Sequence, residues 1–292
     1  MVSRLEYAEE LGCGVGSWQE IGTELEWVFT NPAITHSKLT IAGSDSTEIK
    51  LTAVRPKSSN NSKPRPAIYF IHGGGLVLGN RFLSSGAIDW IKELDAGFIS
   101  VEYRLVPGFT FPIPLEDCFT GLKYVADNAK ILGVDANKIM VAGKSGGGNL
   151  AAGVPLLARD RGGPKIHAQL LIYAMRGDRM ESASSKQFYK TGTWTGEQNS
   201  TAWDWYLGWK RGGKTGEEVS AGSPNTWIDV GSADLFRDGD IAYASKMWEC
   251  GGRCELHVWP EAWQGFDGFA LGTELANVCL KTKLKWMKRA LA

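Results

Sequence analysis

The chain has 292 residues, which is enough for one full domain with a buried core. Its 32 Lys and Arg side chains balance 32 Asp and Glu side chains, so the formal net charge is zero. This balance argues against electrostatic binding to nucleic acid or to an anionic membrane surface. No apolar stretch is long enough to span a bilayer, and the first residues lack the apolar core of a secretory signal, so we expect a cytoplasmic protein.

Five cysteines are scattered along the chain, at Cys13, Cys118, Cys250, Cys254 and Cys279. An odd and dispersed set does not indicate a disulfide framework. Cys250 and Cys254 flank a Gly-Gly turn, but no second pair of Cys or His completes a zinc site, so we expect ordinary packing there. Tryptophan is abundant, with 12 residues, and tryptophan clusters line pockets for bulky apolar ligands as well as cores.

The chain begins with a helical pattern followed by Trp18, Trp27 and Phe29, in a segment that runs to about residue 45. The polar segment 57–64 is typical of a surface loop between two strands. Apolar residues at helical spacing then predict helices over Asp117–Asn128, Asn149–Arg161 and Asp240–Glu249. Short apolar runs rich in β-formers predict strands over Ala67–Ile71, Phe98–Val101, Ile139–Ala142, Ala168–Tyr173, Thr226–Val230 and Glu255–Trp259. This alternation predicts a mostly parallel central sheet that is covered by helices.

A glycine-rich motif, G-K-S-G-G, occupies residues 143–147 directly after the predicted strand Ile139–Ala142 and before a predicted helix. This is the strand-turn-helix setting of the G-x-S-x-G nucleophile elbow. The glycines allow a sharp turn in which the serine adopts a strained backbone conformation. The motif alone occurs often by chance, so Ser145 is a candidate nucleophile that needs a second motif in support.

The second motif is His-Gly-Gly-Gly at residues 72–75, which ends the predicted strand Ala67–Ile71. It matches the oxyanion-hole signature of lipases and esterases. The backbone N–H groups of Gly73, Gly74 and Gly75, together with that of Gly146, are the expected donors to an oxygen that becomes negative during ester cleavage. Because this motif acts through its N–H groups, we interpret His72 as a residue that fixes the loop rather than as a base.

These motifs stand in longer blocks through which the chain resembles the hormone-sensitive-lipase (bacterial family IV) group of serine esterases. The resemblance implies an α/β-hydrolase fold over residues 1–292, with a helical cap built from about 1–45 and 178–222 that roofs a cavity above Ser145. It also implies that Asp234 is the acid of a catalytic triad, in the chain order that the fold uses. The matching blocks are HGGGLVLGN at 72–80, VEYRLVPGFTFPIPLED at 101–117, GKSGGGNLAA at 143–152, GSADLFRD at 231–238 and HVWPEAWQGFDGF at 257–269.

The family places its catalytic histidine about 30 residues after the acid, and in this sequence that position is Gln264. An amide cannot accept a proton near neutral pH, although it can hydrogen-bond both a serine hydroxyl and a carboxylate. We therefore expect the Ser145 side chain to lie within about 5 Å of Gln264, with Asp234 on the other side. Losing a triad base typically lowers turnover by a factor on the order of a million.

Two other residues near these motifs are weaker candidates for a base. Lys144 adjoins the nucleophile, where the family usually has an acidic residue that points away from the cleft, and Asp267 lies one turn beyond Gln264. Gly146 also departs from the family, which commonly has alanine there. The chain has only four histidines, and none occupies the expected place.

Three functions fit these observations. The first is a serine carboxylic-ester hydrolase scaffold for small apolar or aromatic esters, with acyl transfer through Ser145 and activity weakened or diverged because of Gln264. The second is a non-hydrolytic enzyme for elimination or cyclisation. The third is a small-molecule-binding protein, for which the resemblance offers a precedent, since plant gibberellin receptors are relatives without this histidine. None of the three implies a cofactor or a metal, and a homodimer is compatible with all of them.

Overall fold

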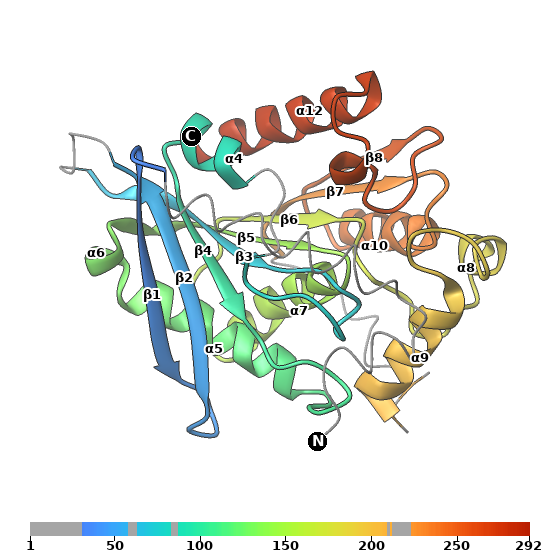
Figure 1. Ribbon diagram of the computed structural model, residues 1–292, viewed down its shortest axis with the longest axis horizontal. Helices are drawn as coiled ribbons and strands as arrows, with labels where there is room; N and C mark the ends of the chain where they lie inside the picture. The colour runs from blue at the N-terminus through green and yellow to red at the C-terminus, as the bar shows by residue number, and fades with distance from the viewer. Residues whose placement is uncertain (1–30, 58–62, 83–86, 209–210, 212–222) are drawn as a thin grey trace.

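The computed structural model describes residues 31–57, 63–82, 87–208, 211 and 223–292. A single sheet runs through this part of the chain (Figure 1), and its strands follow the order β1-β2-β4-β3-β5-β6-β7-β8. The strands from β4 to β8 in this order are parallel, whereas β1 and β2 pair antiparallel at one edge. The strand bounds are β1 Ile34–Ala42, β2 Glu48–Pro56, β3 Arg65–Ile71, β4 Gly97–Glu102, β5 Val134–Lys144, β6 Ala168–Ile172, β7 Asn225–Gly231 and β8 Cys254–Trp259.

Helices cover both faces of the sheet, with α4 and α12 on one face and α5 and α7 on the other (Figure 1). This is the predicted mostly parallel sheet flanked by helices. In the described ranges, no helix combines the length and the apolar character that crossing a bilayer requires. The helix bounds are α4 Ala87–Glu93, α5 Ile113–Asp127, α6 Ala129–Leu132, α7 Gly146–Asp160, α8 Ala183–Gln187, α9 Gly196–Leu207, α10 Arg237–Glu249, α11 Phe266–Phe269 and α12 Glu274–Leu291.

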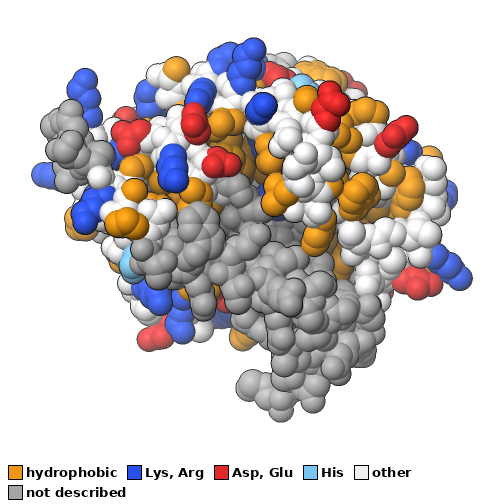
Figure 2. Space-filling view, turned by 45° about the horizontal axis from the view of Figure 1, so that its top comes forward, with side chains coloured by type: hydrophobic (Ala, Val, Ile, Leu, Met, Phe, Trp, Pro, Cys, Tyr) orange, Lys and Arg blue, Asp and Glu red, His pale blue; other side chains and the backbone are white. Residues whose placement is uncertain are grey.

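The core forms where the central parallel strands are covered from both sides. In β3, six of seven residues are buried, and all five residues of β6 are buried. Continuous apolar strands of this kind are expected for parallel strands between two helical layers. On the face shown in Figure 2, Lys and Arg side chains are interspersed with Asp and Glu side chains, as expected from the zero net charge.

The segment to about residue 45, which we expected to belong wholly to the cap, instead contributes β1 to the sheet. In β1, buried Ile34 and Ile41 are separated by mostly exposed residues, and the strand pairs with β2 along its length. Only one face of this edge strand is covered, so its polar residues interrupt the apolar pattern from which strands are predicted. The aromatic residues expected in the cap, Trp18, Trp27 and Phe29, lie outside the described residues.

The segment 178–222, which we expected to complete the cap, is described over 178–208 and at residue 211, and there it contains α8 and α9. Both helices lie near α10, on the side of the sheet where β6 ends (Figure 1). Helix α9 begins with a capping box, in which Thr195 and Gln198 bond each other's backbone N–H groups. Its inner face buries Trp203 and Tyr206.

Candidate active site

Ser145 occupies the turn between β5, which ends at Lys144, and α7, which begins at Gly146. Its backbone angles are φ 51° and ψ −121°, a left-handed conformation that non-glycine residues rarely adopt. Backbone strain of this kind persists only where the surrounding structure enforces it. Here the Ser145 carbonyl oxygen accepts N–H groups from Gly148 at 2.8 Å and from Met175 at 2.9 Å. The serine therefore has the backbone conformation expected of a nucleophile elbow.

The loop after β3 is held by contacts on both sides of His72. The His72 ring stacks on Tyr103 with centroids 4.3 Å apart, and its Nδ1 donates to the Gly73 carbonyl oxygen at 2.8 Å. The Tyr103 hydroxyl in turn donates to the His72 carbonyl oxygen at 2.9 Å. These contacts agree with the interpretation of His72 as the residue that fixes the glycine loop.

The glycine loop and the elbow are in backbone contact. A Cβ atom on Gly146 would lie 2.7 Å from the backbone nitrogen of Leu76, which is closer than real Cβ contacts come, and 3.1 Å from that of Gly75. A Cβ atom on Gly73 would lie 3.4 Å from the Cβ of Ser145. The backbone of Gly73, Gly75 and Leu76 therefore lies against the elbow at Ser145 and Gly146.

Gln264 lies on the loop between β8 and α11 and reaches Ser145 across 119 residues of sequence. Its Nε2 donates a hydrogen bond to Ser145 Oγ at 2.7 Å, well within the 5 Å that we expected. The backbone carbonyl oxygen of Gln264 accepts a hydrogen bond from Thr193 Oγ1, also at 2.7 Å. Its side-chain oxygen has no hydrogen-bond partner among the described residues.

Asp234 follows β7 and is almost completely buried, with 1% of its surface exposed. One carboxylate oxygen accepts the backbone N–H of Phe236 at 2.9 Å, whereas the other has no hydrogen-bond partner in the part of the chain that the structure describes. Burial raises the pKa of Asp234 to about 7. The structure thus joins Ser145 and Gln264 by a hydrogen bond, but among the described residues it shows no such bond between Gln264 and Asp234.

A second set of charges lies behind these loops, and we call Lys144, Asp229, Asp267 and Lys283 the buried charge cluster. Each of the four is at most 8% exposed. Lys283 Nζ lies 3.0 Å from Asp267 and 3.2 Å from Asp229, and Lys144 Nζ lies 3.8 Å from Asp267. The Tyr173 hydroxyl donates to Asp267 at 3.0 Å. Two ammonium groups and two carboxylates thus neutralise each other inside the protein.

The cluster explains why Asp267 is a poor substitute for a base. Burial alone would raise the pKa of Asp267, but the ammonium groups of Lys144 and Lys283 together hold it below its usual range. Burial lowers the pKa of Lys144, against the attraction of Asp267. Asp267 therefore stays ionised as an ion-pair partner and has little tendency to take a proton from Ser145.

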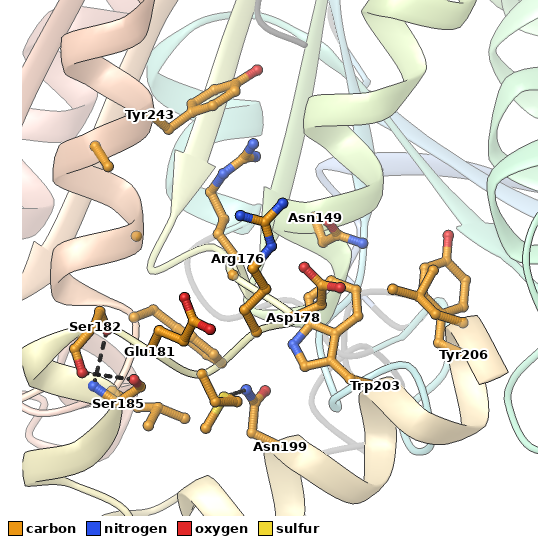
Figure 3. Close-up of a pocket in the computed structure, with 18 of the residues that line it drawn as sticks. Asn149, Arg176, Asp178, Glu181, Ser182, Ser185, Asn199, Trp203, Tyr206 and Tyr243 are labelled. Atoms are coloured by element: carbon orange, nitrogen blue, oxygen red, sulfur yellow. Dashed lines mark hydrogen bonds between the residues drawn. The ribbon is translucent and has the colours of Figure 1, made fainter. Parts of the chain in front are cut away.

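A cavity of about 710 Å³ lies between α9 and the helices α7 and α10. Figure 3 shows Asn149 of α7, Arg176 and Asp178 of the segment after β6, and Trp203 of α9 around it. Its lining includes neither Ser145 nor Gln264, but Asn149 is four residues beyond Ser145, about one turn of helix. The cavity is therefore adjacent to the candidate site, and the predicted roof above Ser145 stays a prediction.

A family model described as the alpha/beta hydrolase fold matches residues 68–267, so the chain belongs to the α/β-hydrolase family. Within that family it is carboxylesterase-like. It is 31% identical over 247 residues to the carboxylesterase NlhH of Mycobacterium tuberculosis, which is 77% of this chain and 74% of that protein.

Two further similarities agree with this class. A protein of Acanthamoeba polyphaga mimivirus, named as an alpha/beta hydrolase, is 27% identical over 222 residues, which is 70% of this chain but only 61% of that protein. The solved structure titled "Bacterial Heroin Esterase" has a TM-score of 0.88 and 29% identity, and the match covers 100% of this chain and 95% of that one. The predicted α/β-hydrolase fold is confirmed.

Proposed function

We propose that the chain is a serine carboxylic-ester hydrolase scaffold in which Ser145 accepts the acyl group and Gln264 occupies the position of the catalytic histidine. Asp234 is the acid of this altered triad, and Gly146 with two of Gly73, Gly74 and Gly75 forms the oxyanion hole. The observation that carries the proposal is the 2.7 Å hydrogen bond from Gln264 to Ser145. A residue at the position of the base should contact the nucleophile in this way.

The proposed chemistry follows from what each group can do with a proton. Attack by Ser145 Oγ on the ester carbonyl creates an oxyanion that the clustered backbone N–H groups stabilise. The hydroxyl proton then needs an acceptor, but the Gln264 amide points an N–H donor at the serine and cannot accept it. An aryl oxide leaves an ester without prior protonation, so the Ser145 proton passes to solvent water and Ser145 acylates slowly. Water needs the same absent base, so the acyl-enzyme accumulates.

The proposed substrate is a small apolar or aromatic ester. The cavity of about 710 Å³ has the size of a small-ligand site, and its lining is rich in aromatic and aliphatic side chains such as Trp203, Tyr206 and Leu235. Because Asn149 in that lining is one turn from Ser145, a group attached to the scissile ester can extend along α7 into the cavity.

The proposal is tested by mixing the protein with p-nitrophenyl acetate and recording intact mass. We expect slow gain of one acetyl group, its absence in Ser145→Ala, and little turnover. Gln264→His should raise turnover by several powers of ten, and Ser145→Ala in that background should remove the gain. If Gln264→His brings no gain and Ser145 never acquires an acetyl group, the hydrolase proposal is wrong.

A binding function is the second candidate, and one feature of the same site favours it. Ser145 Oγ accepts from Gln264, so its own proton is available to a ligand, and the neighbouring backbone groups are also donors. An array of donors without a base suits a carboxylate. Calorimetry with phenylacetate tests this function, which predicts binding that Ser145→Ala weakens and no acetylation of Ser145 by the aryl ester.

A further inference from the structure

Two neighbouring residues of the cap, Thr193 and Trp194, contact the two loops that meet at Ser145. The six-membered part of the Trp194 indole lies against Gly75, so closely that a Cβ atom on Gly75 would be 2.2 Å from Trp194 Cη2. Thr193 Oγ1 donates to the backbone carbonyl oxygen of Gln264 at 2.7 Å. One dipeptide therefore touches the glycine loop on one side and the Gln264 loop on the other.

The orientation of the indole is fixed from within the cap. Trp194 Nε1 donates to Asn199 Oδ1 at 3.2 Å, and Asn199 is completely buried in the first turns of α9. The other end of the Asn199 amide donates to the sulfur of Met180 at 2.8 Å. Thr195, the next residue, caps α9. Trp194 is itself only 4% exposed, so neither its ring nor its partner has room to turn.

On the other face of the same loop, Gly75 and Leu76 contact Gly146 of the elbow. The backbone at Gly75 is therefore enclosed between Trp194 and Gly146. Gly75 has φ +60°, a conformation that glycine adopts without steric cost but does not favour over its alternatives. Packing from both sides is what selects this conformation, and it sets the direction of the adjacent amides.

We propose that Thr193 and Trp194 are positioning residues. Trp194 holds the oxyanion loop, and Thr193 holds the Gln264 loop, so that together they fix the positions of both loops relative to Ser145. The catalytic consequence rests on the proposed hydrolase function, whereas the structural consequence does not. Loss of either contact loosens one loop and leaves the other in place.

Hydrogen–deuterium exchange tests the structural consequence without any substrate. Trp194→Ala should raise exchange at least tenfold in a peptide covering residues 72–79 and change a peptide covering 262–269 little. Thr193→Val should show the reverse pattern. Trp248→Ala and Thr201→Val are the matched controls: Trp248 is 48% exposed on α10 and donates to the Cys254 carbonyl oxygen at the start of β8, and Thr201 donates to the Glu197 carbonyl oxygen within α9. Unchanged exchange in both peptides, or equal effects of the controls, overturns the proposal.

Acylation tests the catalytic consequence. With p-nitrophenyl acetate and p-nitrophenyl hexanoate, Trp194→Ala should slow the rate constant of Ser145 acylation by about 10- to 100-fold for both esters and leave KM nearly unchanged, because misplaced oxyanion donors cost rate rather than affinity. If Trp194→Ala is acylated faster by the hexanoate but not by the acetate, Trp194 lines the acyl pocket, and the positioning role is wrong. If the unmodified protein is never acylated, the proposed hydrolase function is wrong. The hydrogen–deuterium exchange result alone then tests whether Thr193 and Trp194 position the two loops.

Discussion

The two halves of the candidate site are built in different ways. The donor half, formed by Ser145 and the glycine loop, is made of backbone groups, and both the strained turn at Ser145 and the close approach of Gly146 to residues 75 and 76 are present. The acceptor half, formed by Gln264 and Asp234, is made of side chains. Gln264 lies against Ser145 as predicted but presents a donor to it, and one oxygen of each side chain has no hydrogen-bond partner among the described residues.

Under the proposed function, the difference means that proton transfer can be lost without dismantling the site around it. Backbone geometry depends on many residues at once, so the strained turn at Ser145 survives single changes nearby. Base catalysis depends on one imidazole, and a single substitution removes it. The buried charge cluster supports both halves, because Lys144 precedes Ser145 and Asp267 follows Gln264 by three residues.

The largest effect is expected when Gln264→His supplies a base to the acceptor half and a second substitution then removes the carboxylate of Asp234. In the Gln264→His background, Asp234→Asn should lower turnover of p-nitrophenyl acetate by about 10⁴-fold, because the imidazole loses the carboxylate that orients it. Steady-state kinetics measure the change. Full activity of the double variant would show that Asp234 is not part of the catalytic site and that the histidine acts without it.

The next effect concerns the charge cluster. Lys283→Met leaves Asp229 and Asp267 buried with only Lys144 nearby, so the free energy of unfolding should fall by about 3–5 kcal/mol. Urea unfolding measures it. Lys288→Met, on the same helix, breaks a solvent-exposed pair with Glu93 and should change stability little. Similar decreases in the free energy of unfolding for both variants would mean that the buried charge cluster contributes no more to stability than an exposed ion pair.

A pH-dependent effect isolates Asp234. Its pKa is about 7 in the folded protein and near its ordinary value of 3.8 when unfolded, so the folded state holds this proton more tightly. Its contribution to stability is complete below about pH 4 and is lost as pH rises through about 7. Asp234→Asn, which cannot ionise, should be more stable than the unmodified protein at pH 8, by up to about 4 kcal/mol, and equal to it at pH 4. Thermal unfolding at both pH values measures this, and a pH-independent difference would contradict it.

The smallest effect tests the donor half. Gly146→Ala should push residues 75 and 76 away from the elbow and slow acylation of Ser145 roughly tenfold, since small displacements of oxyanion donors are costly. Gly108→Ala is the matched control, because a Cβ atom there meets nothing closer than 3.7 Å. An undiminished acylation rate in Gly146→Ala would show that residues 75 and 76 can move to accommodate the methyl group without misplacing the oxyanion donors.

Most of the central sheet was predictable from local pattern. All six predicted strands are present, with bounds that differ by a few residues, because buried parallel strands are continuous apolar runs. Helix α5 begins at Ile113, four residues before the predicted start, and Pro114 in its first turn suits a helix N-terminus. Strand β1 was missed because its exposed face carries polar residues that interrupt the apolar run.

The site was predictable where motifs are contiguous and not where contacts are long-range. The elbow and the glycine loop each lie within five residues, so spacing alone locates them. The buried charge cluster joins residues from four separate elements, and no local pattern announces that Lys283 is buried. The contact between Trp194 and Gly75 spans 119 positions in the chain and depends on how the segment before α9 packs against the glycine loop.

The charge cluster also constrains the order in which this sequence can change. The resemblance implies an acidic residue at position 144, but that exchange made alone would place three carboxylates around the single ammonium of Lys283. A reversal at position 144 is therefore expected to require an accompanying change at 229, 267 or 283, so that these positions exchange charge as a set. We therefore expect Lys144→Glu alone to destabilise the protein more than Gln264→His does, because only the first change unbalances the buried charge cluster.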